Sequence, residues 1–568
     1  MPTRKLRVGV LVDTRDLLAW ECAMLERIAN SCYAELAVVV RRNTVTERHH
    51  PDGRQGLGSR LSSAAQKVIR TVQAKLEDKV GGSVPDAIEI SKDLDQFRGI
   101  PHLDLTSAQE TSSALINSFD LKRIRAFDVD VFIALAIGPF QGDVPNVAKH
   151  GIWYLPRANH RIENRAANAD GFWEVLHNVP VTESTLQLLS TDPNGAKVIG
   201  RTQLASCTVS VRRNRNLLYW KASYQIPRKL EQLWLLGPDM FFENVDRNNE
   251  YTSVKPTLPL PIPRLADEIA LVSRIFWRIY ANRIRSFFAF PQWILLFDFQ
   301  GEFSLTPSGF RKIIPPRDRS WADPHVLIRN RICYVFIEEL RYSRKRGHIS
   351  VMQVEEDGTH TVPLPILEES HHLSHPFVFE HCGQLFMIPE SAKNRSVDLY
   401  RCVSFPDKWE HYETLLKEVH AVDTIVHFCR GKWWLFTNMR EHVSGSSNDD
   451  LFLFYSEDLQ RGHWTAHPCN PIVSDVTRAR PAGNIFEHEG NLYRPAQDCS
   501  VRYGFGIRIQ EILKISESEY VEREAAFIHP RRGGRMLAMH SYSRAGRIVF
   551  SDALHERWRL FAALRRSA

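Results

Sequence analysis

Cysteine is scarce in this sequence and never occurs as a close pair. The 568-residue chain has nine cysteines, and none of them stands in a Cys-x-x-Cys motif. An odd number of scattered cysteines argues against a disulfide framework and against a zinc site. The histidines between His348 and His467 also lack the spacing of metal ligands. We therefore expect reduced thiols, no metal or other cofactor, and a cytoplasmic protein.

Long hydrophobic runs are missing as well. No window approaches the ~18 uninterrupted apolar residues that suggest a transmembrane helix. The amino terminus reads MPTRKLRVGVLVDT, so its apolar run is brief and ends at Asp13. This pattern predicts a first buried strand and not a signal peptide.

A large excess of one charge is also missing. The net charge of +7 is spread over the whole chain, where Lys and Arg alternate with Asp and Glu. Dispersed charge of this kind indicates a solvated surface, so we expect no nucleic-acid partner. A composition of 43% hydrophobic and 24% charged residues is typical of a folded soluble protein. The length predicts two or three domains.

The first part of the chain alternates strand-like and helix-like segments. Apolar, β-branched runs at 6–12 and 35–41 flank a helical pattern at 17–30. Further strands are expected at 102–105 and 129–137. Strand, helix, strand in this rhythm predicts a parallel sheet with crossover helices.

Two later motifs carry a resemblance to a known family. Gly171-Phe-Trp-Glu-Val-Leu is followed by Pro180-Val-Thr-Glu-Ser-Thr-Leu. Their order resembles the N-terminal domain of the formyltransferases, in which a Gly-x-x-Asn-x-His strand end precedes a tryptophan-bearing helix and a Val-Thr-x-x-Thr strand. The resemblance implies a Rossmann-type α/β domain, which we assign to 1–245. Within it, the composition turns polar and basic at about 44–84, which predicts an insertion that ends in a helix near 64–76.

The catalytic positions of that family are changed here. Aligning Gly151 with the family glycine puts Tyr154 where the catalytic Asn belongs and Pro156 where the His belongs. Formyl transfer needs a donor for the oxyanion and a base for the amine proton, and proline supplies neither. We expect a degenerate domain, in which Arg157 and His160 remain candidates to face a ligand.

A proline-rich link separates the two halves. The segment KPTLPLPIPRL at 255–265 contains four prolines and is expected to be extended. It leads into 266–290, where arginines alternate with aromatic residues. Such a helix lies on an anionic membrane surface or packs as a connector between domains. We assign 246–290 to a linker and a basic amphipathic helix.

The C-terminal half repeats one pattern at intervals of roughly 50 to 60 residues. Each copy has an inward polar residue, a short strand, a turn and a second strand, and the equivalent points are Asp323, His375, Asp423, Arg480 and His540. Such a period predicts a β-propeller. We expect five blades over 291–568, with a strand at 292–298 that closes the last blade by pairing near 536–551.

Seven motifs within these repeats occur in the order of a second family. They include Trp321-Ala-Asp-Pro-His-Val, His375-Pro-Phe-Val-Phe-Glu and Ala479-Arg-Pro-Ala-Gly. The stretch resembles the propeller domain at the N-terminus of plant glucosamine inositolphosphorylceramide transferases, which also occurs in bacterial chains behind a formyltransferase-like domain. The plant proteins carry a separate glycosyltransferase domain, for which this chain has no stretch left, so the plant activity is not simply transferred.

More distantly, the architecture resembles the five-bladed glycoside hydrolases of family 43. That family uses a base in an Ala-Asp-Pro motif, a pKa-tuning Asp and a general acid Glu, so the resemblance implies the first two roles for Asp323 and Asp423. Where the Glu is expected, this chain has Arg480, which binds carboxylate or phosphate but donates no proton at neutral pH. Glycosidic cleavage needs two carboxyl groups with separated pKa values, which leaves Glu390 as a further acid or base.

The predicted site therefore has two groups of residues. The catalytic candidates are Asp323, Glu390 and Asp423, and the substrate-binding candidates are His375, Arg480, Arg494 and Gln497. As an alternative, an Asp at a blade start caps backbone N–H groups, with Arg480 as its ion-pair partner.

The leading hypothesis is a carbohydrate-active protein of cell-surface polysaccharide or glycolipid biosynthesis. It would transfer a glycosyl or related group from a sugar phosphate or nucleotide sugar to a lipid-linked acceptor, with peripheral contact of 266–290 with the inner membrane surface. One alternative is a non-catalytic glycan-binding or scaffolding protein built from degenerate enzyme domains. Another is formyl or acyl transfer to an amino sugar.

Overall fold

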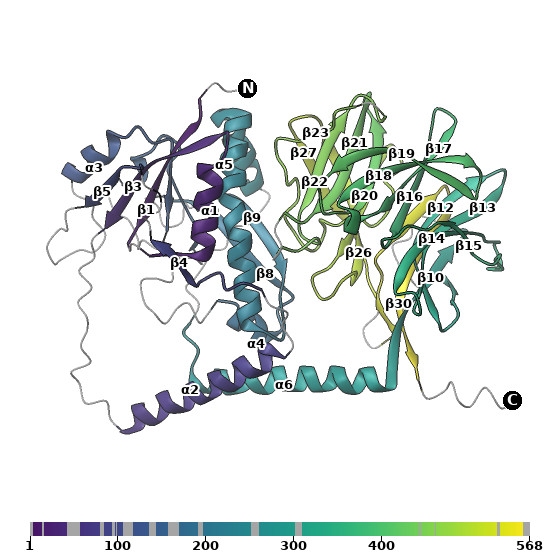
Figure 1. Cartoon of the computed structure of the whole chain (residues 1–568), viewed down its shortest axis with the longest axis horizontal. Coiled ribbons are helices and arrows are strands. Elements are labelled where there is room, and N and C mark those ends of the chain that lie inside the picture. Colours follow the sequence, from purple (N-terminus) through teal and green to yellow (C-terminus); the bar gives the residue numbers. More distant parts are fainter. Residues whose placement is uncertain are drawn as a thin grey trace. The chain divides into compact units, whose positions relative to one another are not determined.

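The structure is a computed structural model that divides into two compact units, Met1–Tyr280 and Ala281–Ala568, each described by itself (Figure 1). It describes residues 4–13, 16–42, 57–79, 84–93, 97, 99–105, 118–135, 144–156, 170–190, 197–250, 261–300, 309–441, 445–460, 462–530 and 534–559. The two loop candidates Arg157 and His160 lie outside these residues, as does the part of the proline-rich segment at 255–260.

The N-terminal unit is built on a seven-stranded sheet with the order β5-β3-β1-β6-β7-β8-β9. Its strands are β1 (Leu6–Val12), β3 (Ala34–Arg42), β5 (His102–Leu105), β6 (Val131–Ala134), β7 (Ile152–Tyr154), β8 (Val181–Leu188) and β9 (Lys197–Ala205). The first five in this order pair in parallel, whereas β8 runs antiparallel to β7 and to β9. The central β1 and β6 are almost wholly apolar because parallel strands are buried on both faces.

Both faces of this sheet are covered. On one face, Val10 of β1 shares a hydrophobic cluster with Trp20 of α1 (Ala19–Ala29) and Leu230 of α5 (Val211–Glu250). On the other face, Phe132 of β6 packs in a cluster with Ile124 of α3 (Ser118–Arg125). A short antiparallel pair, β2 (Asp16–Leu18) and β4 (Ile90–Asp93), lies outside the main sheet.

Three further helices belong wholly or partly to this unit. They are α2 (Leu57–Asp78), α4 (Phe172–His177) and α6 (Leu265–Phe288). The helix α2 lies in the predicted insertion and is longer than the helix expected at 64–76. Phe172 and Val175 of α4 share a hydrophobic cluster with Leu271 and Ile275 of α6, so one side of α6 is held against this unit. None of the helices described has the length and apolarity needed to cross a bilayer.

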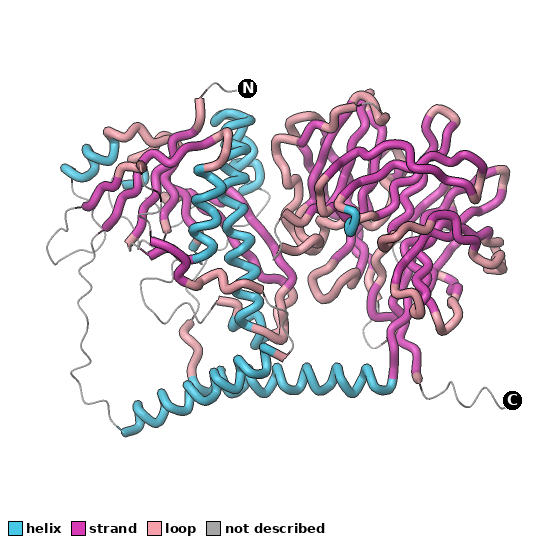
Figure 2. Tube along the Cα trace, viewed as in Figure 1, coloured by secondary structure: helices cyan, strands magenta, loops and turns pink. Residues whose placement is uncertain are grey.

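The C-terminal unit consists of five antiparallel sheets, and Figure 2 shows its strands in magenta. Four of them have four strands each, in chain order. The first sheet contains β12 (Arg319–Arg329), β13 (Ile332–Arg341), β14 (Arg346–Gln353) and β15 (Leu364–Leu367), and the second contains β16 (Ser374–His381), β17 (Gln384–Glu390), β18 (Ser396–Ser404) and β19 (Lys408–Lys417). The third contains β20 (Ala421–Cys429), β21 (Lys432–Met439), β22 (Leu451–Ser456) and β23 (Thr465–Ala466), and the fourth contains β24 (Phe486–His488), β25 (Asn491–Asp498), β26 (Gly506–Ile515) and β27 (Tyr520–Ile528). The five-bladed β-propeller expected from the repeats is confirmed.

The fifth sheet joins the two ends of the propeller. It contains β10 (Ala289–Asp298), β11 (Arg311–Ile313), β28 (Met536–Ala538), β29 (Tyr542–Ala545) and β30 (Ile548–Trp558). β10 pairs along its whole length with β30, from Ala289 opposite Trp558 to Asp298 opposite Val549. The closing strand was therefore predicted correctly, and its partner β30 overlaps the expected 536–551 at its start and extends beyond it to Trp558. This pairing leaves fewer exposed sheet edges.

Candidate functional site

Three predicted site residues occupy the same backbone position in successive blades. Asp323 on β12, His375 on β16 and Asp423 on β20 have positive φ angles of 49°, 44° and 48°. Each stands at a break in the strand register, where a β-bulge lies. Non-glycine residues rarely adopt this left-handed conformation, and a bulge redirects the side chain of the residue that it contains. The recurrence seen in the sequence thus has a structural counterpart.

Asp423 is the centre of a dense ionic network. Its Oδ2 accepts hydrogen bonds from Arg480 Nε at 2.6 Å and from Gln497 Nε2 at 2.6 Å. Burial works against ionisation, but the charge of Arg480, together with its hydrogen bond, holds the pKa of Asp423 well below its usual value. Asp423 is therefore a carboxylate at neutral pH.

Glu390 lies at the other side of the same guanidinium and has the opposite tendency. Arg480 Nη2 donates to Glu390 Oε2 at 3.4 Å, and Arg480 Nη1 donates to Asn448 Oδ1 at 2.9 Å. Burial, followed by the negative charge of Asp423, raises the pKa of Glu390 well above its usual value. The pKa values of the two carboxyl groups are therefore shifted in opposite directions, as those of an acid and a neighbouring carboxylate must be.

Asp323 belongs to a second cluster that the sequence did not predict. His540 Nε2 lies 3.2 Å from Asp323 Oδ1, and His540 Nδ1 lies 2.7 Å from Asp552 Oδ1. Burial alone would lower the pKa of His540, but Asp552 and Asp323 raise it to about 9. Burial raises the pKa of Asp323 to about 7, although the charge of His540 opposes this. His540 is therefore an imidazolium, and Asp323 titrates near neutrality.

His375 joins the two clusters. Its backbone N–H donates to Asp323 Oδ2 at 3.2 Å, and its Nδ1 lies 3.9 Å from Asp423 Oδ1. Burial lowers the pKa of His375, so the ring is neutral at pH 7. Its Nε2 is buried and has no hydrogen-bond partner among the residues that the structure describes. This nitrogen is available to a polar ligand group.

One predicted residue lies apart from these clusters. Arg494 is fully buried, and its guanidinium donates to both carboxylate oxygens of Glu522 and to the carbonyl of Arg478. All of these partners are structural, so Arg494 stabilises its own blade. Gln497, three residues further along β25, does reach Asp423.

Several site residues were missed by sequence reasoning. The sequence marked His540 only as the last of the five equivalent positions in the repeats. That position in the repeat was the signal that His540 faces the same centre as Asp323. Asp552, Asn448 and Tyr503 gave no signal of this kind, because they lie outside the repeated position. The ring of Tyr503 lies 5.0 Å from the guanidinium carbon of Arg480, which is a cation–π distance.

Asp323, His540 and Asp552 also have the spacing of possible metal ligands. One donor atom from each lies within 4.8 Å of the others. However, Asp552 Oδ2 accepts the backbone N–H of Asp323 at 2.9 Å, and Asp552 Oδ1 accepts those of His540 at 3.0 Å and Ser541 at 3.1 Å. With His540 donating between two carboxylates, the donor set fits a hydrogen-bonded relay better than a cation.

Comparison with known sequences finds a match over most of the propeller. Residues 317–537 match the N-terminal region of glucosamine inositolphosphorylceramide transferase 1. The transferase of that name from Arabidopsis thaliana is 35% identical over 209 residues, which are 36% of this chain and 27% of the relative. The one from Oryza sativa subsp. japonica is 35% identical over 204 residues, with coverages of 35% and 27%. This chain thus spans about a quarter of the length of these relatives.

Similar solved structures are more distant. They include Zg3597, a family 117 glycoside hydrolase of Zobellia galactanivorans, with 12% identity and a TM-score of 0.31 over 46% of this chain and 90% of that one. Another is the family 62 α-L-arabinofuranosidase catalytic domain of Coprinopsis cinerea, with 13% identity and a TM-score of 0.31 over 42% and 81%. A third is glycinamide ribonucleotide transformylase 1 of Symbiobacterium toebii, with 13% identity and a TM-score of 0.24 over 40% and 87%.

Proposed function

We propose that the propeller site transfers a glycosyl or related group from a phosphorylated or nucleotide-activated sugar in glycolipid or surface polysaccharide assembly. The match of residues 317–537 to a region of glycolipid-forming transferases supports the substrate class. The observation that carries the chemistry is the pair formed by Glu390 and Asp423, which share Arg480 and have pKa values shifted in opposite directions.

In this proposal each carboxyl group has one task. Protonated Glu390 gives its proton to the leaving phosphate oxygen as the bond from the anomeric carbon to that oxygen breaks. The acceptor hydroxyl attacks the anomeric carbon, and its proton passes to Asp323, whose pKa of about 7 suits a general base. Asp423 stays ionised and stabilises positive charge that develops on the sugar ring. His375, Arg480 and Gln497 orient the donor, and Arg494 has no part in the site.

A second candidate is a glycan-binding protein without turnover. It is favoured by Arg480, because Nε, Nη1 and Nη2 each already donate to a protein oxygen. A guanidinium engaged in this way leaves less capacity for a phosphate. Under this alternative, the polar residues of the propeller centre recognise a sugar without acting on it.

The experiment that separates the two candidates is incubation of the full chain with a panel of nucleotide sugars. We expect nucleotide release with at least one donor, and loss of roughly 10²-fold or more of the rate in Asp323→Asn. The control is Glu489→Gln, an exposed acid in a turn, which should leave the rate unchanged. Binding of a donor without release by the wild type would support the glycan-binding candidate, and release that survives Asp323→Asn would refute our site assignment.

We infer that the N-terminal unit has a formyltransferase-like fold with an altered catalytic position. The supporting feature is the order of its sheet, in which five parallel strands are followed by the antiparallel β8 and β9. The hydroxyl of Tyr154 donates to Gln187 Oε1 at 2.9 Å and so has a structural partner. Formyl or acyl transfer to an amino sugar stays an alternative that would need residues other than Tyr154 and Pro156.

We also propose that α6 brings the protein to a membrane surface that holds a lipid-linked acceptor. Phe276, Trp277 and Tyr280 contact one another on this helix and are 50%, 61% and 47% exposed. Exposed aromatic residues of this kind favour the interface between water and lipid. Arg274 and Arg278 instead donate to backbone carbonyls of Leu176 and Val175, so the aromatic residues would supply most of the affinity.

A further inference from the structure

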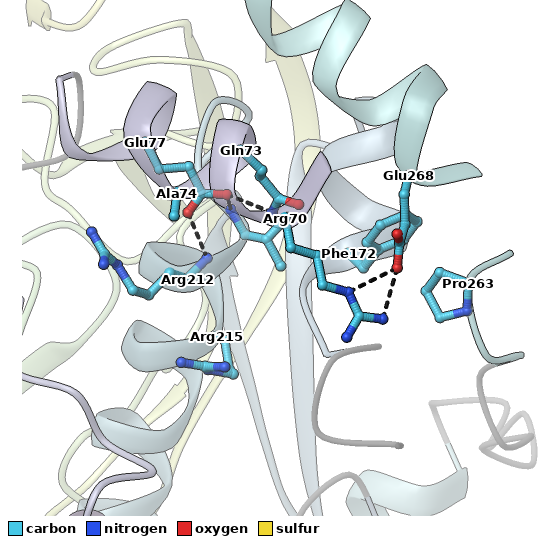
Figure 3. A pocket seen from close by; sticks show the side chains of 10 residues that line it. Arg70, Gln73, Ala74, Glu77, Phe172, Arg212, Arg215, Pro263 and Glu268 are labelled. Carbon is cyan, nitrogen blue, oxygen red and sulfur yellow. Dashed lines mark hydrogen bonds and ion pairs between the residues drawn. The ribbon is translucent and has the colours of Figure 1, made fainter. Parts of the chain in front are cut away.

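A cavity of about 190 Å³ lies in the N-terminal unit, and neither Tyr154 nor Pro156 lines it. It is lined by residues of α2, α4, α5 and α6, and Figure 3 draws their side chains. At about 30 Å³ per water molecule, its volume corresponds to roughly six waters. The space therefore suits one monosaccharide-sized ring and is too small for a nucleotide.

The walls of the cavity are fixed by buried carboxylates. Glu77 of α2 accepts hydrogen bonds from Ser210 Oγ at 2.7 Å and from the backbone N–H groups of Val211 and Arg212, both at 3.2 Å. It thereby compensates the positive end of α5. Arg70 of α2 donates through Nε and Nη2 to Glu268 Oε1 of α6, at 3.0 and 2.8 Å. Together these bonds hold three helices in place, and Figure 3 shows those from Arg70 to Glu268 and from Arg212 to Glu77.

Two polar atoms at this cavity lack partners. Glu268 is 3% exposed, and its Oε2 is buried without a hydrogen-bond partner among the described residues. Arg215 Nε is likewise buried and unpaired within the part of the chain that the structure describes. A buried polar atom without a partner costs free energy unless a ligand or water satisfies it. Two residues that line the cavity thus hold one acceptor and one donor that the described part of the chain leaves unsatisfied.

The charges around the cavity decide what kind of ligand fits. Arg70 is neutralised by Glu268, Arg212 forms an ion pair with Asp78, and Arg215 forms one with Asp86 at 3.2 Å. Because each cation already has a counter-charge, neither a phosphate nor an ammonium ion is favoured. Phe172, which is 3% exposed, and Pro263 add apolar surface that suits the C–H face of a ring.

We propose that this cavity binds a neutral, polyhydroxylated ring of monosaccharide size. One hydroxyl of the ligand donates to Glu268 Oε2, and one of its oxygens accepts from Arg215 Nε. The inference does not depend on transfer by the propeller, because the two sites share no residue.

The decisive variant is Glu268→Gln. Its amide oxygen keeps the bonds from Arg70, while its NH₂ group replaces the acceptor that the ligand hydroxyl needs. Ala74→Leu is a second variant, because it fills the cavity and changes no polar group. The matched control is Asp239→Asn, which removes an acid from the exposed side of α5. Circular dichroism melting checks that all three variants remain folded.

The measurement is saturation-transfer NMR and calorimetry on the full chain with glucose, N-acetylglucosamine and myo-inositol as neutral probes. Inorganic phosphate and glucosamine serve as charged probes. We expect at least one neutral probe to bind, with at least a tenfold weaker Kd in Glu268→Gln and in Ala74→Leu. The same binding should persist in Asp239→Asn, while its loss in Ala74→Leu would place the bound probe in this cavity. The proposal is overturned if no neutral probe binds, if both cavity variants bind as the wild type does, or if phosphate or glucosamine binds more tightly.

Discussion

At the scale of single residues, the propeller site depends on backbone positions that are unfavourable for the side chains they carry. Asp323, His375 and Asp423 all have left-handed φ angles at bulges. Asp and His are among the residues that adopt this conformation more readily than most, yet it still costs free energy of order 1–3 kcal/mol per residue. The fold adopts this unfavourable conformation in three blades, and in each blade it directs one polar side chain to the same centre.

The pKa values of His540 and Asp323 predict how propeller stability depends on pH. The pKa of His540 is raised from 6.5 to about 9 in the folded state. Protonated His540 therefore adds up to about 3 kcal/mol to the free energy of unfolding. This stabilisation is complete below pH 6.5 and is lost as the pH rises through 9. The pKa of Asp323 is raised from 3.8 to about 7. The free energy of unfolding therefore also falls as the pH rises from 4 to 7. We expect the melting temperature of the propeller, followed by calorimetry, to fall between pH 6.5 and 9.

The matched variants for this prediction are His540→Gln and His463→Gln. His463 is exposed, and its substitution should leave the pH dependence as it is. His540→Gln should lower the melting temperature at pH 6 and remove most of the decline toward pH 9. An unchanged alkaline decline in His540→Gln would show that another group causes it.

The predicted site residues show what a sequence reveals at this scale. Equivalent positions of successive blades face one axis. The position of each residue within its repeat was therefore enough to predict a common site for Asp323, His375, Asp423 and Arg480. It misplaced Arg494, whose partner Glu522 lies on β27, two strands away in the same sheet, and is revealed only by strand pairing. It also missed Asp552, because a single aspartate on β30 has no repeated neighbour that marks it.

At the scale of elements, α6 has two sides with different roles. Leu271 and Ile275 are buried in a cluster with Phe172 of α4. Trp277 and Tyr280 do not belong to this cluster and remain exposed. The sequence predicted an amphipathic helix over this segment but left open whether its aromatic residues meet protein or lipid.

We expect the full chain to sediment with phosphatidylcholine vesicles, and the double variant Trp277→Ser, Tyr280→Ser to bind about tenfold more weakly, because it loses two interfacial aromatic rings. Ala281→Ser, an exposed change on the same helix, is the control. Added salt should have little effect, since Arg274 and Arg278 are engaged by carbonyl groups. Vesicle binding equal in the double variant and the wild type would assign the contact to another surface.

The strands give a similar lesson about pairing. The amino-terminal strand of the propeller was predicted within a few residues because its apolar run is bounded on both sides. Its partner was placed too early, since β28, β29 and β30 all carry strand-like sequence. Pairing between segments more than 250 residues apart depends on the closure of the ring, which local pattern does not encode.

At the scale of the whole molecule, the chain combines a mixed α/β unit with a five-bladed propeller. The family match covers residues 317–537, which lie within the propeller. The proposed chemistry therefore depends on groups that the propeller itself supplies, namely Glu390 as acid and Asp323 as base.

The most direct test of this account is the single-turnover rate of nucleotide release from the bound donor by wild type and by Glu390→Gln. We expect the variant to bind the donor with a Kd within about threefold of the wild type and to release nucleotide roughly 10²–10⁴-fold more slowly, since it has lost the general acid. Equal rates of release by the two proteins would contradict the central claim that Glu390 protonates the leaving group.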